Sequence, residues 1–330
     1  MSRSIRVAIT GGGLAGARLI HALVKHARLD VHIFESAAEF RDTGAAIGLP
    51  RNALTALDLI GPPAVQSLER AGAGPMRGAR FMLAQGEDAG SLLDEADFVA
   101  QGKRITSIVH RAAFLRELLA DVPHERMNTG WWCIFALRPY EEAQASVGKG
   151  IVNIEDAREY DWVGDGTYLM HNVIIQGQLV QFIVVAHDKD AESSDSWRRT
   201  ISADELMELY QDWPPHLNKA VNDLLCGEPE QAAIYLWEYP DAHSYVSGPV
   251  CIAGDAAHAT GPWQASGGSM FIEDNIVLST LLGRAETPAQ AQMALKVYDE
   301  VRCPRTQRIV RSSRGTGIIV TGRGKDTGLE

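Results

Sequence analysis

The chain has 330 residues, too many for one small core, and this length predicts two lobes. A net charge of −11 argues against a nucleic-acid surface, because phosphate binding requires clustered lysine and arginine. No apolar run reaches the length of a membrane span, so we expect neither a membrane nor a nucleic acid among the partners.

The four cysteines are scattered along the chain without the spacing of a metal site or a redox pair: Cys133, Cys226, Cys251 and Cys303. We interpret them as free thiols in a reducing compartment, because disulfides persist mainly in oxidising ones. The first predicted strand begins within a few residues of Met1, so we expect no secretory signal. The sequence therefore predicts a cytoplasmic protein without a bound metal, and it leaves open whether the protein is a monomer or a homodimer.

A glycine-rich turn follows the first predicted strand. The short, β-branched run 6–10 is typical of a fully buried parallel strand, and Gly11, Gly13 and Gly16 follow it in G-x-G-x-x-G spacing. In such a turn the first glycine permits the bend and the second lets a pyrophosphate approach the backbone. The third glycine lets helix and strand pack closely.

Leu14 and Ala15 open the helix after this turn, where free N–H groups and the helix dipole favour a phosphate. Four apolar residues predict its buried face: Ile20, Leu23, Val24 and Ala27. Glu35 ends the second strand nineteen residues after Gly16, where a carboxylate accepts from ribose hydroxyls. A glycine pattern alone is sometimes only a tight turn, but strand, helix and acid together predict an adenine-dinucleotide site.

Residues 1–128 read as the first part of this nucleotide-binding lobe. The small-residue segment 44–50, with Ala46 and Gly48, either lies against a flat cofactor or forms a plain loop. Arg111 opens another predicted helix, where a cation is unfavourable for the helix dipole. It therefore faces an anion or is a solvated surface arginine.

Residues 129–247 have the pattern of a second domain. Four strands are predicted, the middle two forming a hairpin: 131–137, 168–175, 179–186 and 233–237. Two helices are predicted between the last two strands, the first opened by a capping box at Ser202 and Glu205. Strands followed by paired helices indicate a mostly antiparallel sheet with one covered face.

Residues 248–330 return to the pattern of the first lobe. Segment 250–253 predicts a buried strand, and Asp255 at its carboxyl end is placed to point into a ligand crevice. We expect His258 to be a satisfied core histidine. Gly267 and Gly268 open a helix and present N–H groups to a developing negative charge. The predicted fold class is α/β, a Rossmann-like three-layer lobe on a parallel sheet with an inserted α+β domain.

Four separated segments of the sequence resemble the class A flavoprotein monooxygenases, specifically the salicylate-hydroxylase-like aromatic hydroxylases: 7–35, 109–111 with its helix, 254–262 and 298–305. The resemblance implies FAD as cofactor and NADPH or NADH as reductant. It also implies hydroxylation of a small phenolic substrate through a C4a-hydroperoxyflavin. A flavin dehydrogenase or epoxidase of the same architecture, or an impaired relative that only binds FAD or a partner, are the alternatives.

The resemblance also implies roles for particular residues. The three glycines of the turn would cradle the pyrophosphate, and Glu35 would bind the adenosine ribose. Arg111 would contact the phosphates or the ribityl chain, and Asp255 a ribityl hydroxyl. The isoalloxazine would be bordered by three residues: Pro262, Gly267 and Gly268.

Aromatic side chains along the predicted sheet are candidates for the substrate pocket, although such residues more often belong to a core. The candidates are Trp132, Phe182 and Trp237. His171 is the candidate for assisting phenol deprotonation, because the pKa of a histidine is readily tuned near neutrality.

The sequence departs from the family pattern at one segment. The family has a long excursion with a strand and a Gly-x-Asp-Gly turn before the strand near Thr129, whereas Asn128 here leads directly into Thr129. The missing strand would pair beside the first strand, so its loss is expected to leave strand edges unpaired. We therefore hypothesise a shortened family member.

Three single positions also depart from the pattern. Phe135 stands where relatives often have a ring-binding arginine, and Asn172 where they often have a tyrosine. Ala265 replaces a usual glycine in the flavin loop.

Overall fold

The computed structural model describes residues 5–35, 46–60, 62–86, 88–100, 105–110, 132–153, 156, 158–188, 198–238 and 242–322. Arg111 and its predicted helix lie outside these ranges. None of the helices within them is both long and apolar enough to cross a membrane.

The glycine-rich turn connects β1 (Ile5–Thr10) to α1 (Leu14–Leu23), and β2 (Leu29–Phe34) follows. The two strands pair in parallel, with Ile5 opposite Leu29, as the sequence predicts for a β-α-β unit. Ile5 and Ile9 are buried, but Ala8 and Thr10 are exposed, so the prediction of a fully buried strand is wrong. A strand is buried throughout only when both sheet faces are covered, and here a core forms on one face.

The predicted buried face of α1 also needs correction. The helix ends at Leu23, and Val24 is 59% exposed. Leu23 is buried and Ile20 packs against its core, as predicted, whereas Ala27 is exposed. Leu14 and Ala17 are also buried, in the core shared with α2 (Arg51–Ile60) and α9 (Gly267–Leu282). The face that packs is therefore set by these long-range neighbours.

Part of the small-residue segment 44–50 is a strand rather than a loop. β3 (Ala46–Leu49) and β4 (Gly74–Met76) pair antiparallel with opposite edges of β7 (Thr106–His110). Helices α2 and α3 (Pro62–Arg70) connect β3 to β4.

The large sheet has eight strands in the order β12-β13-β8-β11-β10-β9-β5-β6. Its pairings are antiparallel except that of β5 with β9, in agreement with the predicted mostly antiparallel sheet. The strands are β5 (Gly78–Leu83), β6 (Leu92–Asp97), β8 (Trp132–Pro139), β9 (Arg158–Val163), β10 (Thr167–Ile174), β11 (Leu179–Ala186), β12 (Arg198–Ser202) and β13 (Glu230–Ile234). The β5–β6 hairpin comes from within segment 1–128, so the predicted domain boundary differs from the structure there. The backbone of this hairpin covers the edge of β9, because β5 pairs with it.

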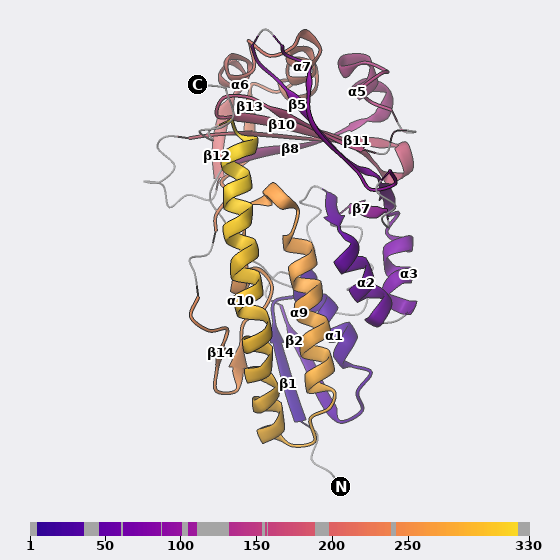
Figure 1. Cartoon of the computed structure of the whole chain (residues 1–330), viewed down its shortest axis with the longest axis vertical. Coiled ribbons are helices and arrows are strands. Elements are labelled where there is room, and N and C mark those ends of the chain that lie inside the picture. The colour runs from indigo at the N-terminus through magenta and orange to yellow at the C-terminus, as the bar shows by residue number, and fades with distance from the viewer. Residues whose placement is uncertain are drawn as a thin grey trace.

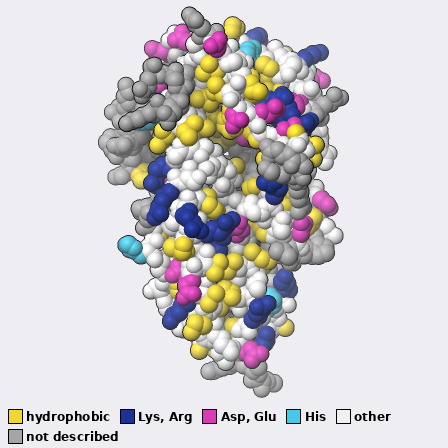
Figure 2. All heavy atoms as spheres, in the orientation of Figure 1, with side chains coloured by type: hydrophobic (Ala, Val, Ile, Leu, Met, Phe, Trp, Pro, Cys, Tyr) yellow, Lys and Arg dark blue, Asp and Glu magenta, His cyan; other side chains and the backbone are white. Residues whose placement is uncertain are grey.

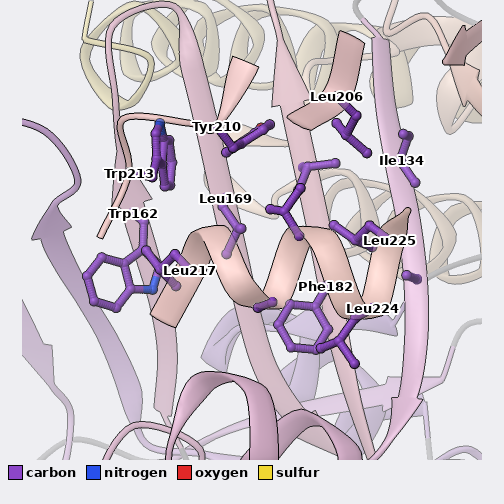
Figure 3. Close-up of a cluster of buried hydrophobic side chains, with 14 of the residues drawn as sticks. Ile134, Trp162, Leu169, Phe182, Leu206, Tyr210, Trp213, Leu217, Leu224 and Leu225 are labelled. Atoms are coloured by element: carbon purple, nitrogen blue, oxygen red, sulfur yellow. The ribbon is translucent and has the colours of Figure 1, made fainter. Parts of the chain in front are cut away.

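Helices cover one face of this sheet, which we call the outer face. They are α5 (Tyr140–Val147), α6 (Ala203–Leu209), α7 (Pro215–Ala220) and the π-helical turn η4 (Val221–Leu225). Ser202 caps α6, because its Oγ accepts a hydrogen bond from the Glu205 backbone N–H at 3.1 Å. Figure 3 shows strand side chains such as Leu169 and Phe182 packed against Leu217 and other helix residues.

The last part of the chain returns to the first lobe. β15 (Val250–Cys251) pairs with β14 (Val246–Ser247), and Val250 is 61% exposed, so the predicted buried strand 250–253 is wrong. Among the described residues, no strand other than β14 pairs with it. The short helix α8 (Asp255–His258), the 3-10 turn η5 (Pro262–Gln264), α9 and α10 (Pro288–Val320) follow.

The two lobes lie at opposite ends of the molecule, and α10 runs along both (Figure 1). At one end of α10 lie β1, β2 and α1; at the other lies the large sheet, with α5, α6 and α7 on its far side. The face of the sheet away from these helices, which we call the inner face, is therefore turned toward the first lobe.

Candidate functional site

The three glycines of the N-terminal turn have three different environments. Gly11 has a φ of 97°, a backbone conformation that favours glycine. A Cβ on Gly16 would lie 1.9 Å from the carbonyl oxygen of Gly11, so only glycine lets helix and strand approach this closely. A Cβ on Gly13 would meet nothing within 4 Å. The open space beside Gly13 fits the approach of a diphosphate to the backbone.

The predicted ribose ligand lies at the same turn. The backbone N–H of Gly12 donates to Oε2 of Glu35 at 2.5 Å. This contact brings the end of β2 onto the glycine-rich turn, as a dinucleotide site requires. Leu14, by contrast, is buried, so only its backbone is available to a ligand.

The second predicted cofactor segment packs on the same turn. A Cβ on Gly254 would lie 2.7 Å from the Cβ of Ala15. Asn275 of α9 donates from Nδ2 to the Ala15 carbonyl at 3.0 Å, although the two residues are 260 positions apart. Asp255 follows Gly254 directly and is exposed. The structure therefore brings Glu35 and Asp255 to one glycine-rich turn from distant parts of the chain.

The predicted flavin loop lies against β3. A Cβ on Gly48 would be 3.6 Å from that of Ala265, and a Cβ on Gly268 would be 3.6 Å from the Gly48 carbonyl oxygen. Ala265 has a φ of 48°, in the left-handed region, which explains why relatives often have glycine at this position. Around Gly267 nothing lies within 4 Å of a built Cβ, so its backbone is accessible. Pro262 begins η5 at the start of this loop.

A buried network holds the Asp255 turn in place. Oδ2 of Asp274 accepts from the Gly254 backbone N–H at 2.9 Å and contacts Nε2 of His258 at 2.7 Å. Oδ1 of the same carboxylate accepts from Nε of Arg302 at 2.7 Å. His258 is thus a core histidine, as expected, but it is satisfied only at Nε2, because its Nδ1 is buried without a partner among the described residues. Burial alone would raise the pKa of Asp274, but the hydrogen bond from His258 and the nearby positive charges outweigh it and lower that pKa.

The network continues through the neighbouring residue of α9. Glu273 accepts from Arg302, from Arg305 at 2.7 Å and from Asn52 of α2 at 2.7 Å. Burial opposes ionisation of this carboxyl, but these donors and charges lower its pKa to about 2. Sequence reasoning missed the roles of Glu273 and Arg302. The signal was present, because Arg302 lies in the 298–305 segment that carries the family resemblance.

His171 lies on the outer face of the sheet, and this corrects its prediction as the catalytic residue. It is 2% exposed and is packed among Trp162, Tyr160 and Phe182. Its Nε2 accepts from Nε1 of Trp162 at 3.2 Å, and burial lowers its pKa to about 3. A histidine sealed under the helices does not reach a substrate on the opposite face.

Two of the three predicted substrate residues are not on the inner face either. Phe182 belongs to the core beneath the helices (Figure 3), and Trp132 belongs to the same core; both are buried. Arg199 lies over the Trp132 ring, 5.5 Å from its centroid. Trp237 follows the end of β13 and is 44% exposed. Strand alternation puts every second residue on each face, so the neighbours of these residues occupy the inner face instead.

Strand pairing arranges the inner face in rows that cross β5, β9, β10, β11 and β8. The middle row is Phe81, Asp161, Met170, Ile183 and Phe135. One flanking row is Ala79, Glu159, Asn172, Gln181 and Leu137. The other flanking row is Leu83, Val163, Tyr168, Val185 and Cys133.

The inner face meets the flavin loop at one aromatic contact. The ring of Tyr168 meets Trp263 of η5 edge-on, with 6.1 Å between their centroids. The backbone N–H of Gly166 donates to the Thr321 carbonyl at the end of α10 at 2.8 Å. The inner face and the flavin loop are therefore parts of one candidate site.

Comparisons with known proteins agree with this geometry. A family model described as an FAD binding domain matches residues 184–313. The 6-methylsalicylate 1-monooxygenase of Aspergillus terreus is 28% identical, over 95% of this chain and 82% of its own length. The salicylate hydroxylase of Pseudomonas putida is 26% identical, over 96% of this chain and 85% of its own.

Solved structures show the same fold. A salicylate hydroxylase in complex with its substrate superposes with a TM-score of 0.79 at 19% identity, covering 99% of this chain and 91% of its own. HpxO of Klebsiella pneumoniae, complexed with FAD and uric acid, gives 0.77 at 19% identity, covering 100% of this chain and 91% of its own. The fold, the turn and the relatives agree over nearly the whole chain, and this protein is thus similar to the class A FAD-dependent aromatic monooxygenases, the salicylate-hydroxylase-like family.

Proposed function

We propose that this flavoprotein hydroxylates a small phenolic ring related to salicylate, with NADPH or NADH as the reductant. The observation that carries the proposal is the packing of the Gly254–Asp255 turn on Ala15, which closes two distant segments around one cofactor site. The names of the relatives, 6-methylsalicylate 1-monooxygenase and salicylate hydroxylase, support the ring class.

In this proposal the residues of the chain bind FAD and position the substrate ring. We assign the open backbone at Gly13 to the diphosphate, Glu35 to the adenosine ribose and Asp255 to the ribityl chain; the space at Gly13 and the contact of Glu35 with the turn support these roles. The exposed backbone of Gly267 and the Pro262 turn are placed at the ring system. When bound, FAD supplies the oxygen chemistry that side chains lack, and the protein orients the substrate ring and excludes water.

Apolar inner-face residues are suited to covering an aromatic ring. Met170, Ile183 and Phe135 follow one another across three adjacent strands. Phe135 is 37% exposed, which leaves an apolar surface on this face for a ring to contact. A substrate between this surface and the flavin loop is shielded from solvent on both sides.

A spectrum of the purified protein, followed by NADPH and NADH oxidation with a panel of phenols, tests this function. We expect stoichiometric bound flavin and oxidation that a phenol stimulates. Oxygen from labelled O₂ should appear in the product, and its absence would favour the dehydrogenase alternative. A colourless protein, or no stimulated oxidation, rejects the working enzyme and favours the impaired relative.

The second candidate function is that of an impaired relative, which only binds FAD or a partner, and two observations support it. The alignment with the Aspergillus terreus enzyme spans 371 positions, whereas this chain has 330 residues, so at least 41 residues of that enzyme have no counterpart here. Within the described part of the chain, β2 is the only strand paired with β1. Both observations support our hypothesis of a shortened family member.

We also propose a cytoplasmic location. None of the four cysteines, all of them among the described residues, forms a disulfide, which fits a reducing compartment. Fractionation of the native cells, followed by detection of the protein, tests the proposal.

A further inference from the structure

Four inner-face side chains form a polar group that the roles described above do not use. We call Glu159, Asp161, Tyr168 and Asn172 the acidic cluster. Glu159 and Asp161 lie on β9, opposite Asn172 and Met170 of β10 respectively. Because residues directly opposite and diagonal to one another on one sheet face are in reach, the four side chains are neighbours.

Two atoms of this cluster are buried and unsatisfied. Asp161 is 2% exposed, and its Oδ1 accepts from the Tyr168 hydroxyl while Oδ2 has no partner among the described residues. Asn172 is also 2% exposed. Its Oδ1 accepts from Gln181 at 3.1 Å, but its Nδ2 meets no acceptor in the described ranges. Buried polar atoms are normally hydrogen-bonded. Oδ2 of Asp161 and Nδ2 of Asn172 are therefore an acceptor and a donor that a ligand on the inner face can use.

The charge within the three rows of the inner face is one-sided. Within the three rows, Asp161 and Glu159 are the acidic residues, and these rows contain no lysine, arginine or histidine. The other charged residues on this face lie outside the rows, on the outer strands of the sheet: Asp94, Arg198 and Glu230. Burial raises the pKa of both carboxyls, and the charge of Asp161 raises that of Glu159 further. Burial also raises the pKa of Tyr168.

The exposed cations of α10 lie on the outside of the molecule. Figure 2 shows lysine and arginine side chains gathered at mid-height of one face, at the level of α10. Arg305 is paired with Glu273, and Arg314 with Glu238. These two arginines are therefore paired outside the acidic cluster.

These observations indicate which functional groups a substrate ring needs in order to bind the acidic cluster. A phenol O–H donates to Oδ2 of Asp161, and a ring oxygen accepts from Nδ2 of Asn172. An ionised ring carboxylate would instead be an anion beside two carboxyls with no compensating cation, which is unfavourable in a partly desolvated site. We propose that the acidic cluster selects an uncharged phenol and excludes ring carboxylates. The proposal rests on the proposed function and narrows its substrate class.

Rings that differ only in the carboxylate test the proposal. The pairs are phenol with salicylate, and 3-methylphenol with 6-methylsalicylate. Their affinities are measured on the holoenzyme at pH 8 by calorimetry, which does not depend on turnover. We expect each neutral ring to bind at least about tenfold more tightly than its carboxylated partner. Tighter or equal binding of the carboxylated ring, or binding of neither, overturns the proposal.

Substitutions in the acidic cluster test whether it causes the tighter binding of neutral rings. Asp161→Asn and Glu159→Gln remove the charge at nearly constant shape and should reduce the ratio of affinities several-fold by strengthening carboxylate binding. Glu141→Gln, at an exposed position of α5 beyond the outer face, should leave the ratio unchanged. An equal ratio in all three variants would show that the cluster does not select the ring.

The two proposals fail in different ways. If the neutral rings bind preferentially but none stimulates NADPH or NADH oxidation, the proposed function is wrong and the selectivity stands. If oxidation is stimulated by carboxylated rings only, the proposed function stands and the acidic cluster is not a selectivity element.

Discussion

Gly13 and Gly16 lie three residues apart, yet an added methyl group meets different surroundings at each. Gly16→Ala should destabilise the fold by about 3 kcal/mol, because its Cβ would overlap the Gly11 carbonyl. Gly13→Ala should change stability by less than about 1 kcal/mol, since its φ of −58° suits alanine. Its methyl would instead fill the diphosphate space and weaken FAD at least about tenfold.

Urea unfolding of the apoprotein and flavin titration separate the two effects. A Gly13→Ala protein that retains full FAD affinity would contradict the diphosphate assignment. A Gly16→Ala protein as stable as the unchanged chain would contradict the close-packing role.

Arg18 is fully buried, and its three guanidinium nitrogens have no partner among the described residues. Burial lowers its pKa to about 10. Because an uncompensated buried charge is costly, Arg18→Met should stabilise the fold by about 1–4 kcal/mol in urea unfolding. Arg6→Met, at an exposed position, is the matched control and should change the free energy of unfolding by less than about 0.5 kcal/mol. A less stable Arg18→Met protein would show that the cation has a role in the fold.

Asp161 predicts a pH dependence of ring binding. Burial raises its pKa to about 7, so it is mostly neutral below and mostly ionised above that pH. The groups that face it are Glu159 on its own strand and Tyr168 on β10, while β5 contributes apolar residues such as Phe81. Salicylate affinity should therefore rise as pH falls from 8 to 6, and Asp161→Asn should flatten this profile. A salicylate affinity that falls as pH decreases would contradict the assignment.

At the scale of elements, the contact between α8, α9 and α10 depends on one guanidinium. Arg302 is 2% exposed and bonds Asp274, Glu273 and the Met270 carbonyl. Arg302→Met leaves two buried carboxylates without this partner and should cost about 3–5 kcal/mol of unfolding free energy. Arg305→Met removes a half-exposed partner of the same Glu273 and should cost less than about 1 kcal/mol.

The same network predicts sensitivity to acid. The folded-state pKa of Glu273, about 2, lies below the value of 4.5 for the free side chain. Its stabilisation is therefore complete above about pH 4.5 and is lost as pH falls toward 2. Urea midpoints between pH 6 and 3 should fall less steeply in Arg302→Met than in the unchanged chain. Equal slopes would show that Arg302 does not couple to this titration.

At the scale of the whole molecule, we expect the edge of β1 to limit the stability of the first lobe, because β1 pairs only with β2 among the described strands. Inserting the segment of a longer relative after Asn128 should supply the strand that pairs beside β1. We expect the unfolding midpoint to rise by at least about 4 °C and FAD to bind more tightly. A glycine-serine insert of equal length is the control, because it adds chain without a strand. An equal effect of both inserts would contradict the missing-strand hypothesis.

Local patterns predicted much of the fold and some of the site. The predicted hairpin of strands 168–175 and 179–186 corresponds to β10 and β11, and the capping sequence at Ser202 located the start of α6. His171 and Phe182 lie opposite each other in this hairpin, but the sequence does not say which face of the sheet the helices cover. The buried network at Asp274 depends on residues from three helices, so no short pattern predicts it.

The sequence by itself determined the strand, glycine-rich turn and helix at the N-terminus, because backbone sterics and hydrogen bonding act over a few neighbouring residues. Only the tertiary structure decided that His171 lies in a core while Asp161 and Asn172 lie toward the flavin loop. The reason is physical: both faces of a strand obey the same local rules, and which face is covered depends on the packing of α6 and α7.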